Sequence, residues 1–462
     1  MMSTIAIIFS LLMLMYFAYR GMTVLLLAPL LAAFAVLLSG DGSMMMPKYT
    51  ETFMFALSGY LLNFFPVFLF GALFGQLMAD SGAATGIAKG IVKMLGSRQA
   101  ILTVIIACGL LTYGGVSLFV VAFAIYPISK VLFREANIPK RLIPATIALG
   151  SFTFSMTALP GTPAATNAIP IPFFNTNAFA APGLGLIGAM IMLIGGWLWL
   201  QSRAKKAASL GEGYGKHDSE SSADLAIFEK NVMPFSLSLL PLVLVIAMNA
   251  IFTYTFSNMD FSSLQEVFPN LNIKGKTGLW AIIASLLIAC VVLVFLRLGK
   301  WTSLQETINK GVYGSMLPIF NTASEVGYGA VVASLAGFAI IRDSVLNVST
   351  NPLISEAVAM SVLAGITGSS SGGLSIAMRT LGADYLRMGI EAGIDPDLLH
   401  RVAVMAAGGF DTLPHCGAII TLLSICHLNH KQSYLNIAAV TIAIPIVAVI
   451  SVIALGTVFG SF

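Results

Sequence analysis

The sequence predicts an all-α integral membrane protein with about ten transmembrane helices and two re-entrant hairpins, arranged as an inverted repeat with two broken helices. Three observations support this fold class. First, 57% of the 462 residues are apolar and only 10% are charged, which is too little charge to cover a soluble protein of this size. Second, proline and glycine interrupt two long apolar runs, at Leu159–Asn167 and at Asp411–Ala418. Third, the same order of span, hairpin, broken span and span occurs twice along the chain.

The chain begins with three apolar runs, Ile5–Tyr19, Met22–Leu38 and Phe53–Met78. The next apolar region, Ala100–Ser129, has basic segments on both sides, and positive loops favour the cytoplasmic side of a membrane. Each arm of about 15 residues would reach only about 22 Å, whereas the hydrocarbon core is about 30 Å thick. We therefore expect a re-entrant hairpin with its tip at Thr112–Ser117.

The first broken span is predicted at Leu142–Phe174, and Gly183–Leu200 returns across the membrane. The polar segment Arg203–Lys230 is rich in glycine, serine and charge, so we expect a cytoplasmic linker there. Three further crossings are predicted at Pro234–Tyr254, Thr277–Leu296 and Gly314–Ile340.

The second hairpin is predicted at Ile354–Gly389, with Gly368–Gly373 at its tip. Its flanks are not basic, which indicates entry from the outside. The second broken span, Leu398–Cys426, and a last crossing at Ser433–Phe459 complete the chain.

Matched motifs recur in the two halves at a nearly constant separation. Pro66 and Gly75 correspond to Pro318 and Gly327, and the Gly-Gly pair at 114–115 corresponds to the pair at 372–373. The charge rule makes the lead spans of the halves run in opposite directions, as in an inverted repeat. We divide the chain into an N-terminal scaffold pair at 1–52, a first inverted repeat at 53–201, a cytoplasmic linker with connecting helices at 202–313, and a second inverted repeat at 314–462.

The four interruptions carry serine, threonine, asparagine and opened backbone. Half-helix N-termini attract anions, whereas hydroxyls and half-helix C-termini suit a small cation or a neutral hydroxyl. A hydroxy acid matches this lining, although small residues in membrane helices also serve close packing. The candidate substrate-binding residues are Thr112, Gly114, Gly115, Ser117, Thr162, Asn167, Ser369, Ser370, Ser371, Gly372, Thr412 and Arg379. Arg379 either neutralises a substrate carboxylate or pairs with Asp384.

Three ionisable residues lie in apolar segments and are candidates for carrying a proton: Glu325, Asp411 and His415. Ionisable groups inside a membrane are rare and mark ion or substrate pathways. The alternatives are structural: a hydrogen bond from Glu325 to a neighbouring helix, and a neutral core histidine at position 415.

Several function classes are disfavoured. The chain has no phosphate-binding Gly-Lys-Ser/Thr loop for ATP-driven transport, and no paired nucleophile or metal triad for an intramembrane enzyme. Its four cysteines lack metal spacing, and no basic stripe suggests nucleic acid. We therefore expect no cofactor and no metal. A passive anion channel remains an alternative, which the paired interruptions disfavour.

The two broken spans resemble the gluconate permease (GntP) family. The first carries Thr157-Ala158-Leu159-Pro160-Gly161-Thr162-Pro163, and continues through Asn167-Ala168-Ile169-Pro170 to Ala180-Ala181-Pro182-Gly183. The second carries Asp411-Thr412-Leu413-Pro414-His415, followed by Gly417 and Ala418, and is most similar to the D-β-hydroxybutyrate permease branch.

This resemblance implies membership of the ion transporter superfamily, with a homodimer, a scaffold and a moving domain that carries both hairpins. It implies proton-coupled symport of a small hydroxycarboxylate, such as 3-hydroxybutyrate or gluconate, across a bacterial inner membrane. Coupling to sodium is the alternative.

Overall fold

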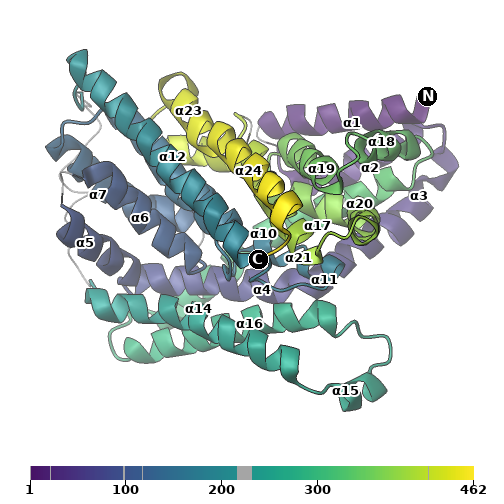
Figure 1. Cartoon of the computed structure of the whole chain (residues 1–462), viewed down its shortest axis with the longest axis horizontal. Helices are drawn as coiled ribbons and strands as arrows, with labels where there is room; N and C mark the ends of the chain where they lie inside the picture. Colours follow the sequence, from purple (N-terminus) through teal and green to yellow (C-terminus); the bar gives the residue numbers. More distant parts are fainter. Residues whose placement is uncertain (1, 21, 97–98, 117, 216–231, 415) are drawn as a thin grey trace.

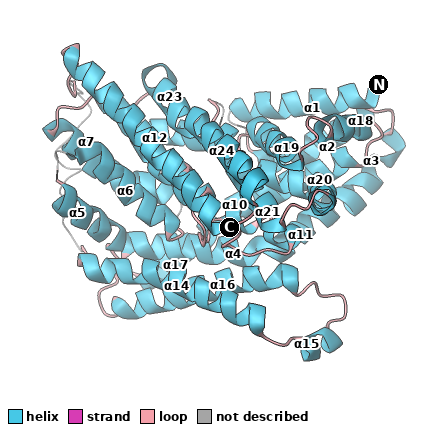
Figure 2. Cartoon of the chain, viewed as in Figure 1, coloured by secondary structure: helices cyan, strands magenta, loops and turns pink. Residues whose placement is uncertain are grey.

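The computed structural model describes residues 2–20, 22–96, 99–116, 118–215, 232–414 and 416–462. Throughout these ranges the regular structure is helical, so the predicted all-α fold class is confirmed (Figure 2).

The first helices match the predicted apolar runs closely. Their bounds are α1 (Met2–Tyr19), α2 (Val24–Leu38), η1 (Gly42–Met44), α3 (Met45–Pro47), η2 (Lys48–Phe53), α4 (Met54–Asp80), α5 (Ala83–Leu95), α6 (Ala100–Tyr113) and α7 (Leu118–Glu135). Helices α6 and α7 pack against each other as a helical hairpin. Gly115 has φ +97°, a left-handed conformation that glycine adopts without strain, and it helps to turn the chain at the tip.

The first broken span consists of short pieces followed by one long helix: η4 (Lys140–Leu142), α8 (Ile143–Phe152), α9 (Phe154–Thr157), α10 (Ala165–Ala168), α11 (Ile171–Phe174) and α12 (Pro182–Ser209). We call the non-helical stretch Ala158–Ala164 the first break. The predicted interruption at Leu159–Asn167 is therefore present, but it begins one residue earlier and ends where α10 starts.

The middle of the chain forms α14 (Phe235–Asn258), α15 (Ser262–Val267), α16 (Lys274–Leu296), α17 (Leu304–Ala333) and α18 (Phe338–Leu346). The predicted single crossing Gly314–Ile340 is wrong at both ends, because α17 begins at Leu304 and the chain bends by 101° between α17 and α18. Gly337 lies at this bend against the backbone of Ser3 and Thr4, where a Cβ would not fit. The packing of the N-terminal residues against Gly337 thus stabilises the bend. The hydropathy of the sequence does not report this contact between distant segments.

The last part of the chain forms α19 (Pro352–Thr367), α20 (Ser370–Glu391), α21 (Pro396–Phe410), α22 (Gly417–Ile425), α23 (His430–Ala438), η5 (Ala439–Ala443) and α24 (Ile444–Phe459). Helices α19 and α20 form the second hairpin, whose arms meet at Gly368 and Ser369. The helix that ends at Phe410 resumes at Gly417, as predicted, and we call the residues between them the second break.

Within the described residues, five helices are long and apolar enough to cross a membrane, and the bent α17–α18 pair is a sixth candidate. The predicted number of about ten crossings also counts the short and broken segments, so it stays a prediction.

Helix α12 shows how the two broken segments are oriented. The first starts near its C-terminal end, where Arg141 pairs with Glu212 at 2.6 Å, and Leu149 packs on Gly196. The second starts at its N-terminal end, where Arg401 lies against Gly185. The two segments therefore run in opposite directions toward their breaks, as an inverted repeat requires.

Long helices hold this arrangement together. Helix α17 packs along α4 and also against α20, while α14 and α16 pair below them (Figure 1). Helices α12 and α24 run side by side across the opposite face (Figure 1). One continuous apolar core joins these layers, and the hairpins and both breaks lie within it.

Candidate functional site

The tip of the second hairpin is a tight turn at which one helix ends and another begins. Gly368 has φ +65° and ends α19. The Ser369 side chain caps α20 by accepting a hydrogen bond from the Gly372 amide at 3.1 Å. A Cβ on Gly373 would overlap the backbone of Leu363 and Ala364, so the two arms are in direct backbone contact there. The N-terminal turn of α20 thus starts in the interior of the protein, with its positive helix end exposed to whatever occupies the site.

Glu325 of α17 lies against this turn. It is 2% exposed, and its Oε2 atom has no hydrogen-bond partner among the described residues. A Cβ on Gly372 would overlap the Glu325 carboxyl group, so only glycine permits this approach. One turn earlier on α17, the Thr322 hydroxyl lies 3.5 Å from the Ser371 hydroxyl.

Hydroxyl groups surround the Glu325 carboxyl. The Tyr60 hydroxyl of α4 lies near Glu325, Thr322 and Ser375. The buried hydroxyls of Tyr60 and Ser375 also have no hydrogen-bond partner in the described part of the chain. Buried polar atoms are rarely left unpaired, so this cluster points to a site that a bound solute or water would complete.

A second carboxyl group, that of Asp411, lies on the other side of the same turn. Asp411 follows α21 at the second break, is 5% exposed, and interacts with the side chain and backbone of Ser370. Its Oδ1 atom has no partner within the described ranges. The first turn of α20, Ser370–Gly372, therefore lies between one buried carboxyl group from α17 and another from the second break.

Side chains of α23 donate hydrogen bonds to backbone carbonyls of the second break. The Tyr434 hydroxyl donates to the Thr412 carbonyl at 3.1 Å, and His430 Nε2 donates to the Pro414 carbonyl at 2.9 Å. The Thr412 hydroxyl donates to the Gly409 carbonyl at 2.9 Å and lies 2.7 Å from the Thr441 hydroxyl. Thr412 is thus engaged with the protein. His415, the third candidate for proton carriage, lies outside the described residues, as does Ser117 of the first hairpin.

The first break is also satisfied internally. Asn167 is 0% exposed and donates to the carbonyls of Thr162 and Ala178, each at 3.0 Å. Its Oδ1 atom accepts from Arg401, so every polar group of the Asn167 carboxamide is used within the protein. Thr162 is 0% exposed and its hydroxyl accepts from the Ala164 amide at 3.4 Å.

The tip of the first hairpin caps this break. The Tyr113 hydroxyl donates to the Pro160 carbonyl at 2.7 Å, and a Cβ on Gly115 would come within 2.9 Å of the Pro163 ring. Gly114 lies against Leu242 of α14. Thr112 is 4% exposed, and its hydroxyl has no hydrogen-bond partner in the described structure. This hydroxyl is therefore free to bind a solute at the tip.

Arg379 is exposed on α20 and does not pair with Asp384. The predicted pair is therefore wrong. Asp384 instead binds Arg342 of α18, at 2.5 and 2.8 Å, and Arg387 at 3.4 Å. The bend between α17 and α18 brings Arg342 to Asp384, and hydropathy does not report that bend.

Sequence reasoning missed Arg401 and His400, which the structure places at the centre of the protein. Arg401 is 0% exposed and donates to the carbonyls of Ala180, at 2.7 and 3.0 Å, and Thr157, at 3.3 Å. The signal was available, because an arginine inside the apolar run after Leu398 is as unusual as Asp411.

Glu356 of α19 was also missed. It is 0% exposed, and neither carboxyl oxygen has a partner among the described residues. It faces Tyr385 of α20, whose hydroxyl donates to the neighbouring Ser355 carbonyl at 3.1 Å.

No group of three or more metal-ligating side chains occurs in the described part of the chain. The chemistry available at the hairpin tip is therefore that of two buried carboxyl groups, several hydroxyls and a helix N-terminus.

Apolar membrane-length helices, two broken segments that run in opposite directions and a buried polar site between them define a multi-pass membrane transporter. The sequence comparisons agree with this class. The GntP family permease profile matches residues 1–409. The YxjC protein of Bacillus subtilis, named as an uncharacterized transporter, is 45% identical over 99% of this chain and 100% of its own length. The chain belongs to the GntP permease family.

Two solved structures share the fold at low sequence identity. MtrF of Neisseria gonorrhoeae, described among antimetabolite efflux pumps, has a TM-score of 0.56 at 13% identity and aligns over 91% of this chain and 84% of its own. The YdaH transporter of Alcanivorax borkumensis has a TM-score of 0.54 at 15% identity and aligns over 91% of this chain and 89% of its own.

Proposed function

We propose that this transporter carries a small hydroxycarboxylate, such as 3-hydroxybutyrate, in symport with protons. The observation that carries the proposal is the position of the Glu325 carboxyl group against Gly372, at the N-terminal turn of α20. Its Oε2 atom has no hydrogen-bond partner among the described residues. The resemblance of the second break to the D-β-hydroxybutyrate permease branch supports the choice of substrate.

The substrate carboxylate would bind at the first turn of α20, where backbone amides and the helix dipole favour an anion. Its hydroxyl group would bond to Ser371 and Thr322, which lie 3.5 Å apart. Both groups of a hydroxy acid thus find partners within one helical turn.

The position of the two carboxyl groups supports coupling to protons. An anion at Ser370–Gly372 would lie between Glu325 and Asp411, and three negative charges in one buried site repel strongly. Protonation of a carboxyl group therefore favours substrate binding, and by thermodynamic linkage a bound substrate favours protonation.

Uptake by purified protein in proteoliposomes tests this proposal. We expect saturable counterflow of 3-hydroxybutyrate, and accumulation that an inward proton gradient drives and a protonophore abolishes. Accumulation that survives the protonophore and follows a sodium gradient would reject proton coupling in favour of sodium. Flux that neither saturates nor shows counterflow would indicate a passive anion channel.

The remaining expectations are part of the same proposal. We place the protein in a bacterial inner membrane as a homodimer, with both hairpins in a domain that moves against a scaffold.

A further inference from the structure

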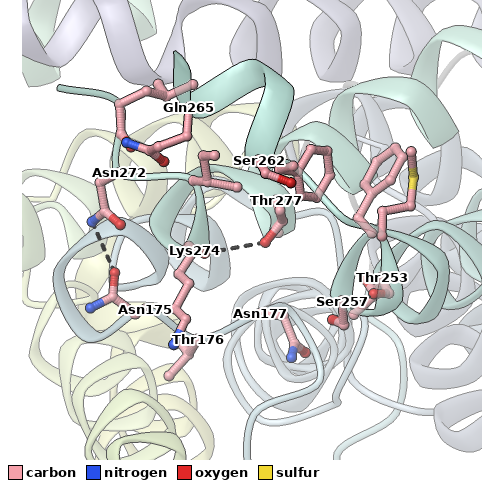
Figure 3. Close-up of a pocket in the computed structure, with 16 residues that line it drawn as sticks. Asn175, Thr176, Asn177, Thr253, Ser257, Ser262, Gln265, Asn272, Lys274 and Thr277 are labelled. Atoms are coloured by element: carbon pink, nitrogen blue, oxygen red, sulfur yellow. Dashed lines mark hydrogen bonds between the residues drawn. The ribbon is translucent and has the colours of Figure 1, made fainter. Parts of the chain in front are cut away.

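A polar cavity lies away from the hairpin tips, between α14, α15, α16 and the loop that follows α11 (Figure 3). Its volume is about 650 Å³, within the range of small-molecule sites. Its polar lining residues are Asn175, Thr176, Asn177, Thr253, Ser257, Ser262, Gln265, Asn272, Lys274 and Thr277.

The lining of this cavity suits an anion that also carries hydroxyl groups. Lys274 is its only charged side chain among the 16 lining residues that Figure 3 draws. The neighbouring Asp260 carboxylate is already bonded to the amide and hydroxyl of Ser262. The Asn175 and Asn177 oxygens accept hydrogen bonds from Asn272 and from the Phe179 amide, while their NH₂ groups donate to nothing in the described structure.

One wall of the cavity leads along α14 to the first break. Asn249, Thr253 and Ser257 are spaced by four residues and so share one face of this helix. Thr253 and Ser257 line the cavity, while Asn249 donates to the Gly161 carbonyl in the first break at 3.1 Å. The Thr253 hydroxyl and the Asn249 Oδ1 atom are buried and have no partner among the described residues.

The opposite wall leads to the same place. The Thr176 hydroxyl, which lines the cavity, lies 2.6 Å from Nδ1 of the buried His400. His400 Nε2 lies 3.3 Å from the Asn167 Oδ1 atom, and the Asn167 NH₂ group donates to the Thr162 carbonyl of the first break. Polar groups from two separate elements thus connect this cavity with the first break.

We propose that this cavity is a vestibule that binds the transported anion, through Lys274 and the asparagine NH₂ groups, before the anion reaches the helix breaks. The proposal takes the nature of that anion, a small hydroxycarboxylate, from the proposed function. The loop Asn175–Pro182 contains no lysine or arginine, which favours the outside of the membrane, so we expect the vestibule to open there.

Thiol labelling of Ser257→Cys tests the vestibule without depending on transport. The four native cysteines are all buried, so the introduced thiol is the accessible one. In intact cells we expect an anionic methanethiosulfonate to label it faster than a cationic one, and Lys274→Gln to remove that preference. Ser344→Cys, on an exposed face of α18 outside the cavity, is the matched control and should show no effect of Lys274→Gln.

Uptake kinetics test the link to the substrate. Loss of a charge-assisted hydrogen bond made on entry should raise the KM of Lys274→Gln for 3-hydroxybutyrate about tenfold, with little change in kcat. The same substrate should slow labelling of Ser257→Cys. Lys300→Gln, at the other end of α16 and exposed, should keep the wild-type KM.

The possible results separate a failure of the proposed function from a failure of the vestibule. If wild-type protein takes up neither 3-hydroxybutyrate nor gluconate, the proposed function fails, while the labelling preference still tests the vestibule. If Ser257→Cys shows no anionic preference, or if wild-type uptake saturates while Lys274→Gln keeps its KM and substrate gives no protection, the vestibule is rejected.

Discussion

Arg401 and Asn167 meet in the interior, with 3.3 Å between the guanidinium Nη1 and the carboxamide Oδ1, although 234 residues separate them in the sequence. This contact joins the start of α21 to α10, so the two broken segments hold each other in place. The Arg401 guanidinium also binds the backbone carbonyls of Thr157 and Ala180. It therefore replaces hydrogen bonds that the broken helix cannot make within itself.

Arg401→Met should destabilise the protein strongly. It removes the donors to the buried carbonyls of Thr157 and Ala180, which corresponds to a loss of about 3 kcal/mol or more. Thermal unfolding in detergent measures the change. Arg387→Met is the control, because Arg387 is exposed and makes one long ion pair, at 3.4 Å, whose contribution to stability is small. Equal melting temperatures for both variants would contradict a bracing role for Arg401.

Gly372→Ala should abolish most uptake. The added methyl group would overlap the Glu325 carboxyl group and push it away from the first turn of α20. Overpacking of this kind costs about 1–3 kcal/mol, which corresponds to a rate loss of about tenfold or more. Gly382→Ala lies on the same helix with its nearest neighbour at 3.6 Å, so it should retain wild-type uptake in the same assay. Full activity of Gly372→Ala would remove this contact from the site.

Glu325→Gln should separate exchange from accumulation. Glutamine keeps the shape of the side chain but cannot release a proton, so substrate exchange should persist while accumulation driven by a pH gradient disappears. Counterflow and gradient-driven uptake are measured on the same proteoliposomes. Unchanged accumulation in this variant would assign proton coupling to another group, of which Asp411 is the nearest candidate at the α20 turn.

Glu356→Met should stabilise the fold and impair uptake. Both Glu356 oxygens lack a partner within the described residues, so an apolar side chain of similar length loses no hydrogen bond and gains about 1–3 kcal/mol. A carboxyl group kept at such a cost indicates a functional role. Melting temperature and uptake rate are compared with those of Glu391→Met, an exposed position at the end of α20. A variant that is both more stable and fully active would show that Glu356 has no part in transport.

The ion pair between Arg141 and Glu212 should make stability depend on acidity. The Arg141 guanidinium, 2.6 Å away, holds the pKa of the Glu212 carboxyl below its usual value of 4.5. A carboxyl group with a lowered pKa stabilises the folded state above its unfolded pKa, and this contribution disappears as the pH falls through its folded pKa. Wild type should thus melt slightly higher than Glu212→Gln at pH 7, and the difference should disappear as the pH falls through the lowered pKa of the folded state. Since both side chains are more than one third exposed, the difference should stay below about 1 kcal/mol. A difference that grows in acid would contradict this sign.

The helix breaks and hairpin tips were predictable from the sequence because their causes are local. Pro160, Gly161 and Pro163 open the first broken helix, and Gly368 and Ser369 end one arm of the second hairpin and cap the other. Glu325 and Asp411, predicted as proton carriers because they are ionisable groups in apolar segments, lie beside the tip of the second hairpin, and their role stays a prediction.

What the sequence did not reveal depends on contacts between distant segments. Asn167 was predicted to bind substrate, but its NH₂ group donates to the carbonyls of Thr162 and Ala178, and its oxygen accepts from Arg401. The bend after α17 brings Arg342 to Asp384, a contact that the local sequence does not report. Hydropathy averages over a window, so single charges such as Arg401 and Glu356 are diluted by their apolar neighbours.

The close backbone contact that Gly373 permits also limits how the site can open. Because the arms of the second hairpin touch through their backbones there, splaying them would strip both chains of close packing in the interior. The α19–α20 pair is thus expected to behave as a rigid body. Admission of a solute to Ser370–Gly372 would then require α17 or the second break to slide past an intact hairpin, so a cross-link between α19 and α20 should be tolerated and one between α17 and α20 should arrest the cycle.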